Sequence, residues 1–344
     1  MIRIGVLAAR DSWYAKDLIR AAEQRSCATT VELLSFAELQ VELGAKRGLQ
    51  VRTESVNAGN GRADRVVPQA DQLTATKQLN RLNVDCIGDL DAIMVRTMPL
   101  GSLEQVIFRM DCLHALEAAG RPVINPPRTL EVAIDKWLTL HRLHLAGVPV
   151  PPTIACQSRD AAVAACEQLG SDVLIKPIFG GEGRGILRVQ GTDMAWRACG
   201  TVSQLGQVLY VQQYLDHLGY DIRVLIIGSK MHCIKRICSP GAWRANLSQG
   251  SRAEPHELTD EQRELATVAA QSVGGSVLGI DILPLRSGGH VVLEVNAVPG
   301  WKGLSRALQI DVAGEVIDHV ASVIAQSKSS LDRCGASSGV RFPN

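Results

Sequence analysis

Blocks of apolar residues alternate with amphipathic segments along the first third of the chain. The stretches IRIGVLAA (residues 2–9) and DAIMVRT (91–97) are typical of buried β-strands, and a helix is expected over residues 16–25. Residues 42–80 are largely polar and contain NAGNGRADR, so we expect a loop or an irregular insertion there. Strands that alternate with helices predict a doubly wound α/β domain over residues 1–125.

Capping patterns mark the start of two further helices. Ser102 and Gln105 have the spacing of a capping box, and so do Thr259 and Gln262. Another helix is expected over residues 130–146, because the glycine and the proline that follow it commonly terminate helices.

The second half of the chain is rich in predicted strands. The short apolar runs VLIKPI, ILRVQ, VLYVQQYL, DIRVLIIG and KMHCIKRI predict successive strands with helices around them, and hence an α+β arrangement. The stretch SVLGIDILPLRSGGHVVLEVNA predicts a hairpin that turns at residues 287–289. A last helix is expected over residues 311–326, and the Gly/Ser-rich tail at 327–344 is expected to be disordered.

Composition and charge exclude several classes of protein. Of the 344 residues, 46% are hydrophobic and 21% are charged, as in ordinary globular proteins. The formal net charge of +1 offers no strong field for nucleic acid or an anionic membrane, and we expect neither as a partner. Nine scattered cysteines without a CxxC pair predict free thiols and no zinc site. The N-terminus does not resemble a signal peptide, so a cytoplasmic protein is expected.

Three oxygen-bearing side chains lie on the predicted hairpin. Glu294 and Asn296 are two residues apart on a strand and therefore point to the same face. If the hairpin folds symmetrically about Gly288, Asp281 falls opposite residues 294–296. Carboxylate and amide oxygens suit Mg²⁺, usually together with water and nucleotide phosphates. The alternative is an ordinary solvated face of an antiparallel strand.

A lysine and a glycine-rich loop follow another predicted strand. Lys176 ends the apolar run VLIK, and Gly180, Gly181 and Gly183 follow it closely. Glycines let backbone N–H groups approach phosphate oxygens, and a lysine beside them neutralises charge. The spacing is neither that of a Walker A motif nor that of a dinucleotide fingerprint, and the alternative is a flexible hairpin loop. Lys136, on a predicted helix, carries no such signal by itself.

Two arginines lie within apolar strands. Arg223 and Arg236 are expected on neighbouring strands, where an arginine usually has an anionic partner. The candidate partners are Asp221, Glu294 or a bound phosphate. The long polar segment 238–253 is typical either of a functional lid or of a plain surface loop. It contains two further polar candidates, Arg244 and Asn246.

The order of these motifs resembles that of the ATP-grasp superfamily. A lysine on a helix is followed by LIKP with a glycine loop, VQQY, DIRVLIIG, WRAN before a long loop, GIDIL and LEVNAVPG. The set is most similar to the RimK-type α-L-glutamate ligases, which include ribosomal-protein and tetrahydromethanopterin ligases. The resemblance extends over residues 90–325, and it is the ordered set that is specific.

The resemblance implies an ATP-grasp fold in three parts. A pre-ATP-grasp α/β domain would span residues 1–125, a central subdomain 126–206 and a C-terminal subdomain 207–326, with ATP between the last two. The residues implied to bind ATP are Lys136, Lys176, Gly180, Gly181, Gly183, Gln212, Gln213 and Tyr214, the last three as a hinge at the adenine. The implied metal ligands are Asp281, Glu294 and Asn296. The residues implied at the acylphosphate and the substrates are Arg223, Arg236, Arg244 and Asn246.

The resemblance also implies an ADP-forming carboxylate–amine ligation. A carboxylate attacks the γ-phosphate of ATP to give an acylphosphate, and an amine then displaces phosphate. Such chemistry needs alignment and charge neutralisation more than acid–base groups. The stretch VRTMPLGSLEQVIFRMDCLHALE is more similar to the pterin-cofactor ligases than to the ribosomal-protein ligases, so we expect glutamate to be added to a small pterin or furan cofactor. The alternatives are a protein C-terminus, a carrier protein of lysine or arginine biosynthesis, and a non-catalytic ATP-binding regulator.

The implied cofactors and partners follow from the same resemblance. They are ATP, two ions of Mg²⁺ or Mn²⁺, L-glutamate and a small-molecule acceptor, and the family suggests a homo-oligomer, as a dimer or a tetramer. Gln213 stands where the closest family pattern has an acidic residue, a difference that bears on nucleotide affinity or preference.

Overall fold

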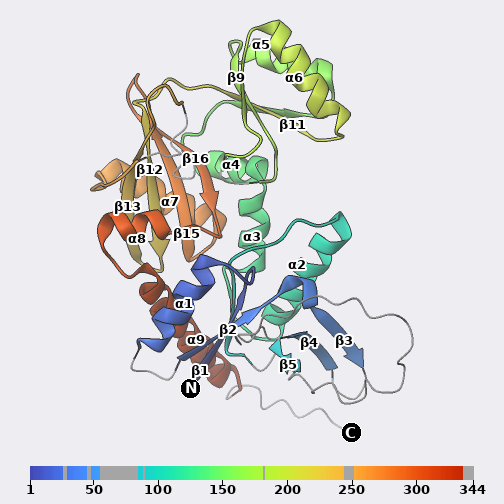
Figure 1. Ribbon diagram of the computed structural model, residues 1–344, viewed down its shortest axis with the longest axis vertical. Helices are drawn as coiled ribbons and strands as arrows, with labels where there is room; N and C mark the ends of the chain where they lie inside the picture. The colour runs from blue at the N-terminus through green and yellow to red at the C-terminus, as the bar shows by residue number, and fades with distance from the viewer. Residues whose placement is uncertain are drawn as a thin grey trace, which may run out of the picture. The chain divides into compact units, whose positions relative to one another are not determined.

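A computed structural model describes most of the chain, and the described residues are 1–25, 29–44, 48–54, 84–87, 90–180, 183–243 and 252–335 (Figure 1). The chain divides into two units, one formed by Met1–Pro127 with Ala313–Asn344 and the other by Arg128–Val312. All the candidate site residues belong to the second unit. Among the described residues, no helix is long and apolar enough to cross a membrane.

The first unit is built on a parallel sheet with the strand order β2-β1-β6-β7. Its strands and helices are β1 (Ile2–Leu7), α1 (Trp13–Glu23), β2 (Thr29–Leu34), β6 (Ala92–Val95), α2 (Leu103–Ala118) and β7 (Val123–Ile124). Val6 and Ile93, on the two central strands, are fully buried. The Ser102–Gln105 capping box is present. The predicted α/β arrangement is therefore confirmed for this unit.

A small antiparallel sheet belongs to the same unit. It consists of β3 (Gln40–Gly44), β4 (Gly48–Glu54) and β5 (Val84–Cys86). The expectation of a loop over residues 42–80 was wrong for its first part, because β3 and β4 form a hairpin in which Val41 pairs with Val51. Apolar residues at alternate positions of QVELG and GLQVRTE supply a strand pattern that the polar surroundings obscured. Residues 55–83 lie outside the described part.

Helix α9 (Val312–Gly335) belongs to the first unit from Ala313 onward. Two ion pairs hold it there, Arg25–Asp318 and Lys328–Asp91. The prediction placed a helix over residues 311–326 in the C-terminal subdomain and disorder from 327. The helix instead continues to Gly335, because no proline interrupts it and Lys328 has a carboxylate partner. The last residues of the predicted tail, 336–344, lie outside the described part.

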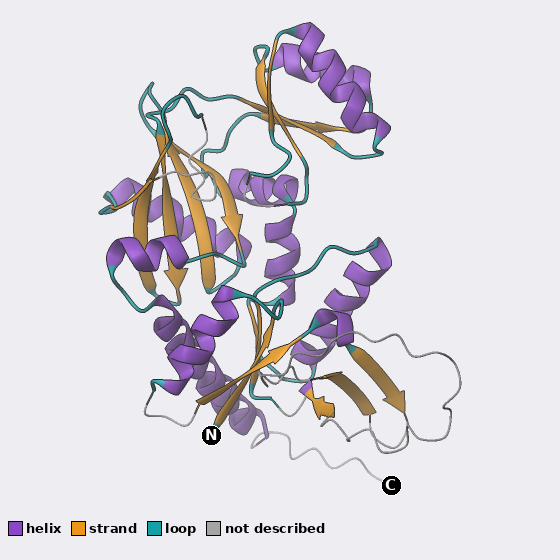
Figure 2. Ribbon diagram, in the orientation of Figure 1, coloured by secondary structure: helices purple, strands orange, loops and turns teal. Residues whose placement is uncertain are grey.

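The second unit contains two antiparallel sheets, each accompanied by helices (Figure 2). The first sheet has the strand order β10-β9-β11-β8. Its elements are β8 (Thr153–Cys156), α5 (Arg159–Gln168), β9 (Asp172–Lys176), β10 (Leu187–Gln190), α6 (Thr192–Gln204) and β11 (Leu209–Gln213). Small residues such as Ala162 and Cys199 let both helices pack on Val173 and Val211 in a shared core.

The second sheet has the strand order β14-β13-β12-β15-β16. Its elements are β12 (Tyr220–Ile227), β13 (Lys230–Ile237), β14 (Arg252–Pro255), α7 (Asp260–Val273), β15 (Val277–Pro284), β16 (His290–Asn296) and α8 (Lys302–Leu308). Every residue of β15 is buried, and β15 pairs with β12 on one side and with β16 on the other. The Thr259–Gln262 capping box is present. The predicted α+β arrangement is confirmed.

The helix predicted over residues 130–146 is two helices. They are α3 (Pro127–Ile134) and α4 (Lys136–Leu145). Asp135 between them has an extended backbone, and its side chain accepts a hydrogen bond of 2.9 Å from the backbone N–H of Leu138. An N-cap therefore begins a new helix at this point and places Lys136 in its first turn. The division of this unit into 126–206 and 207–326 stays a prediction.

Candidate active site

Asp281 and Glu294 lie opposite each other on β15 and β16. They are register partners, and so are Gly279 and Asn296. Glu294 lies within the range 294–296 that the hairpin predicted opposite Asp281, although the register shifts between Asp281 and Ile282. Asp281 is only 5% exposed, and Glu294 and Asn296 are partly buried. The side-chain oxygen of Asn296 accepts a hydrogen bond of 2.8 Å from the backbone N–H of Val298, which fixes the amide at the strand end.

The two opposed carboxyl groups differ in acidity. Burial raises the pKa of Glu294, and the negative Asp281 beside it raises that pKa further, against the effect of nearby cations. Burial also acts to raise the pKa of Asp281, but Arg223 and Arg236 outweigh it, so the pKa of Asp281 is lowered. Glu294 is therefore the member of the pair that takes up a proton when no cation lies between them.

The donors at this hairpin fit Mg²⁺. Two opposed carboxylates that together favour a proton can also be neutralised by a divalent cation, and the amide oxygen of Asn296 is a further hard ligand. Among the described residues, no group of three or more His, Cys, Asp or Glu side chains could hold a metal ion. The hairpin would thus supply few ligands and leave the rest to water and phosphates, as is usual for Mg²⁺.

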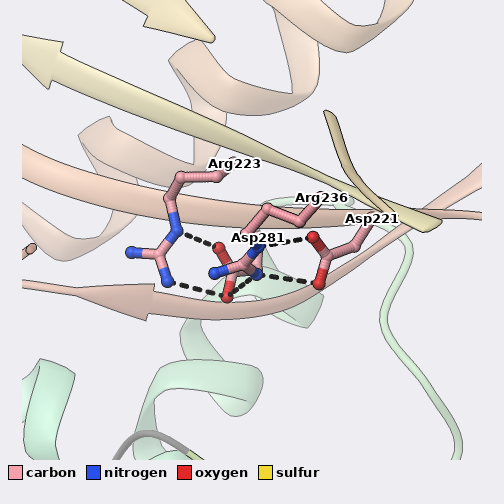
Figure 3. A network of polar contacts seen from close by, with 4 residues as sticks. All are labelled: Asp221, Arg223, Arg236 and Asp281. Carbon is pink, nitrogen blue, oxygen red and sulfur yellow. Dashed lines mark hydrogen bonds and ion pairs between the residues drawn. The ribbon is translucent and has the colours of Figure 1, made fainter. Parts of the chain in front are cut away.

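Two arginines surround Asp281 in a network with Asp221 (Figure 3). Arg223 Nε lies 2.5 Å from Asp281 Oδ1. Arg236 Nη2 lies 2.8 Å from Asp281 Oδ2, and its Nε lies 2.6 Å from Asp221 Oδ1. The predicted ion pair with Asp221 is therefore found for Arg236. The pairing of both arginines with Asp281 was not foreseen.

The two candidate lysines and Glu294 lie within one another's electrostatic field. Burial lowers the pKa of Lys176 to about 8, against the effect of the negative Glu294. Burial also lowers the pKa of Lys136, again opposed by Glu294 and by Asp135. The structure thus brings the lysines of α4 and β9 to the carboxyl group of β16, although they are far apart in sequence.

The glycine loop after β9 has a backbone that favours glycine. Gly180, Gly183 and Gly185 have φ values of 125°, 70° and 74°, a region that other residues rarely adopt. The carbonyl oxygen of Gly180 accepts a hydrogen bond from Nζ of Lys136, so this lysine lies at the loop. The predicted site residues Gly181, Arg244 and Asn246 lie outside the described part of the chain.

The predicted hinge at the end of β11 is tied into the sheet. The backbone N–H of Gln213 donates to the carbonyl of Pro152 (2.9 Å), and that of Tyr214 donates to the carbonyl of Asp172 (3.0 Å). The Arg188 guanidinium lies 3.5 Å from the centre of the Tyr214 ring, and its charge pairs with Asp172. The two backbone N–H groups of Gln213 and Tyr214 are therefore already engaged within the protein.

Sequence reasoning missed the role of the Gln212 side chain. Its Oε1 accepts a 2.6 Å hydrogen bond from Nζ of Lys176, and its Nε2 donates to Thr153 Oγ1 at 2.9 Å. Gln212 is 1% exposed, so it holds the lysine from inside the sheet. The one signal in the sequence is a polar residue in the apolar run VLYVQQYL.

Gly279 leaves room for the Arg223 guanidinium, and we expect Gly279→Ala to destabilise the protein. A Cβ there would lie 2.5 Å from Arg223 Nη1 and 2.9 Å from Pro299 Cβ. The arginine would have to leave Asp281, at a cost of roughly 1–3 kcal/mol in the free energy of unfolding. Thermal denaturation measures the loss. Gly200→Ala, within α6, is the control and should be neutral or stabilising. Equal stability of both variants would contradict the argument.

Comparison with known proteins gives a family match over the region of the site. A model of the RimK-like ATP-grasp domain matches residues 133–320. The tetrahydromethanopterin:α-L-glutamate ligase of Methanosarcina acetivorans is 35% identical over 266 residues, which cover 69% of this chain and 82% of that protein. The glutamate–LysW ligase ArgX of Sulfolobus acidocaldarius is 34% identical over 270 residues, which cover 74% and 95%.

Solved structures show the same fold. The ATP-grasp ligase PsnB, complexed with a phosphomimetic variant of a minimal precursor, Mg and ADP, superimposes with a TM-score of 0.65 and 20% identity. The alignment covers 94% of this chain and 98% of that chain. At this identity the likeness concerns the fold alone, and it extends over both units of the chain.

Proposed function

The chain belongs to the family of RimK-like ATP-grasp domains, and on that basis we propose an ATP- and Mg²⁺-dependent ligase that adds L-glutamate to a carboxylate of a small cofactor, with a pterin or furan one-carbon carrier as acceptor. The observation that carries the proposal is that Lys136 and Lys176 both interact electrostatically with Glu294, the register partner of Asp281. Two cations beside two carboxylates suit a triphosphate and its metal ion.

The residues of the chain bind and align the reactants. Lys136 and Lys176 neutralise phosphate oxygens of ATP, and the backbone N–H groups of the loop around Gly180–Gly183 donate to them. Arg223, with Arg244 and Asn246, holds the anionic groups of the acceptor and of glutamate. The acceptor carboxylate attacks the γ-phosphorus, ADP leaves, and the glutamate amine then displaces phosphate from the acylphosphate.

Asp281, Glu294 and Asn296 hold Mg²⁺ in this proposal. The metal supplies Lewis-acid stabilisation of the charge that develops on the transferred phosphoryl group. We propose two ions, with Mn²⁺ as a substitute for Mg²⁺. The hinge at Gln212–Tyr214 receives the adenine through its carbonyl oxygens, because the N–H groups of Gln213 and Tyr214 donate within the protein. We also propose a cytoplasmic homo-oligomer.

A carrier protein is the second candidate for the acceptor. The observation that favours it is the match to the glutamate–LysW ligase, in which 95% of the length of that relative is covered by this chain. Both candidates share the phosphoryl chemistry of the site and differ only in the group that presents the carboxylate.

A mass-spectrometric assay tests the proposal. Purified protein is incubated with Mg²⁺, ATP, L-glutamate and a small-molecule extract of the source cells, and ADP is measured in parallel. We expect a cofactor whose mass increases by one or more glutamyl units, with matching ADP. A mass shift only in a protein, when whole lysate is supplied, would favour the carrier or C-terminal acceptor. Absence of ADP in both cases would contradict the ligase and favour an ATP-binding regulator.

A further inference from the structure

Arg236 is held differently from the other cations of the site. It makes a two-point contact with Asp221, through Nε at 2.6 Å and Nη2 at 2.8 Å. The same Nη2 lies 2.8 Å from Asp281 Oδ2. Its side chain and that of Asp221 are only 7% and 8% exposed. A planar guanidinium that bridges two buried carboxylates has its donors directed at both, and a substrate would have to displace one of them.

Arg223 offers an internal contrast. It makes its ion pair with Asp281 alone, through Nε and Nη2, and its charge also acts on the nearby Glu294. Its side chain is 13% exposed, and it borders Gly279, where no side chain confines it. Exchanging a carboxylate partner for a substrate anion should cost less free energy for Arg223 than for Arg236. Arg236 would have to give up a buried contact with Asp221 or with Asp281.

From this contrast we infer that Arg236, together with Asp221, is a positioning residue for the metal-binding carboxylate and not a substrate contact. The Asp221–Arg236 pair fixes one oxygen of Asp281 across the sheet (Figure 3), and so orients the carboxylate whose register partner is Glu294. The inference rests on the proposed function for the metal site. It assigns Arg236 a role different from the one at the acylphosphate that the family resemblance implies.

The distribution of charge among these side chains supports this role for Asp221. With Asp221 ionised, the positive charge of Arg236 is shared between two carboxylates, and Asp281 keeps part of its charge for a cation. Without that carboxylate, Arg236 would pair with Asp281 alone and compete directly with the metal. Loss of Asp221 therefore lowers metal affinity through orientation and through charge, and both effects have the same sign.

Mn²⁺ binding measured by EPR titration tests the inference on the full-length protein, with and without a non-hydrolysable ATP analogue. We expect Asp221→Asn and Arg236→Lys to raise the Kd for Mn²⁺ by about 10–100-fold, the usual effect of removing a group that orients a metal ligand. In turnover assays, the Mg²⁺ concentration needed for half-maximal rate should rise by a similar factor. The kcat at saturating Mg²⁺ should recover, because the metal ligands themselves remain.

Asp318→Asn and Arg25→Lys are the matched controls. Arg25, which follows α1, contacts Asp318 of α9 through Nε and Nη2 at 2.6 and 2.7 Å, the same two-point geometry in the other unit. They should leave the Kd for Mn²⁺ unchanged. If circular dichroism shows that Asp221→Asn does not fold, the Kd for Mn²⁺ of Arg236→Lys tests the inference, because this variant keeps the positive charge.

Two outcomes would overturn the inference in different ways. If both variants keep the wild-type Kd for Mn²⁺ while the KM for glutamate or the acceptor rises, Arg236 contacts substrate and the inference alone fails. If the wild-type protein binds no Mn²⁺ even with the ATP analogue, the metal site of the proposed function fails, and the inference fails with it.

Discussion

Replacing Glu294 by alanine is expected to abolish ligation while the protein stays folded. Glu294 is the register partner of Asp281 and interacts electrostatically with Lys136 and Lys176, so its replacement removes a proposed metal ligand. A metal ion stabilises a phosphoryl-transfer transition state by several kcal/mol, and about 4 kcal/mol corresponds to on the order of 10³-fold in kcat. ADP release in the presence of saturating substrates measures the effect.

Glu294 variants should lose activity without losing thermal stability. Burial and the negative Asp281 raise the pKa of Glu294, so at neutral pH its charge is unfavourable in the metal-free protein. Glu294→Gln removes that charge, and we expect a melting temperature in Mg²⁺-free buffer at least as high as that of the wild type. Glu264→Ala, on the exposed face of α7, is the control for both measurements. A Glu294→Ala protein with full activity would refute the metal assignment.

Replacing Lys176 by methionine is expected to lower kcat/KM for ATP by about 10²–10³-fold, the usual effect of removing a charged donor that stabilises transferred charge. The chain of contacts from Thr153 through Gln212 to Lys176 fixes this ammonium group at the end of β9. Methionine keeps the apolar stem and removes the charge. Lys230→Met, at the exposed start of β13, is the matched control and should leave kcat/KM unchanged. Unaltered ATP kinetics in Lys176→Met would remove this lysine from the nucleotide site.

The same lysine predicts the pH dependence of nucleotide binding. Burial lowers the pKa of Lys176 to about 8, so the ammonium form is complete well below pH 8 and is lost as the pH rises through that value. The affinity of the free enzyme for ATP should therefore fall between about pH 7 and 9. Equilibrium binding of a fluorescent ATP analogue measures it. The Lys176→Met variant should show no such decline, and a decline of the same size in that variant would assign the effect to another group.

The pairing of β15 with β16 is the part of the candidate site that the sequence predicted best. A glycine turn between two apolar strands predicts that Asp281 falls opposite residues 294–296, and a register shift between Asp281 and Ile282 makes Glu294 its partner. The glycines after Lys176 were equally accessible to sequence reasoning, because positive φ values single out that residue. By contrast, two features were missed. The helix break at Asp135 lies within a sequence that is otherwise typical of one continuous helix, and strands β3 and β4 lie in largely polar sequence.

The sequence by itself therefore determined the family and the α/β and α+β arrangements, and it named the candidate residues for ATP and metal, since these depend on local spacing and on the order of motifs. Only the tertiary structure decided how the charges are partnered. Lys176 meets Gln212 from 36 residues away, and Arg223 meets Asp281 from 58 residues away. Such pairs arise when antiparallel strands distant in the chain become neighbours, and burial then makes each charge depend on the partner across the sheet.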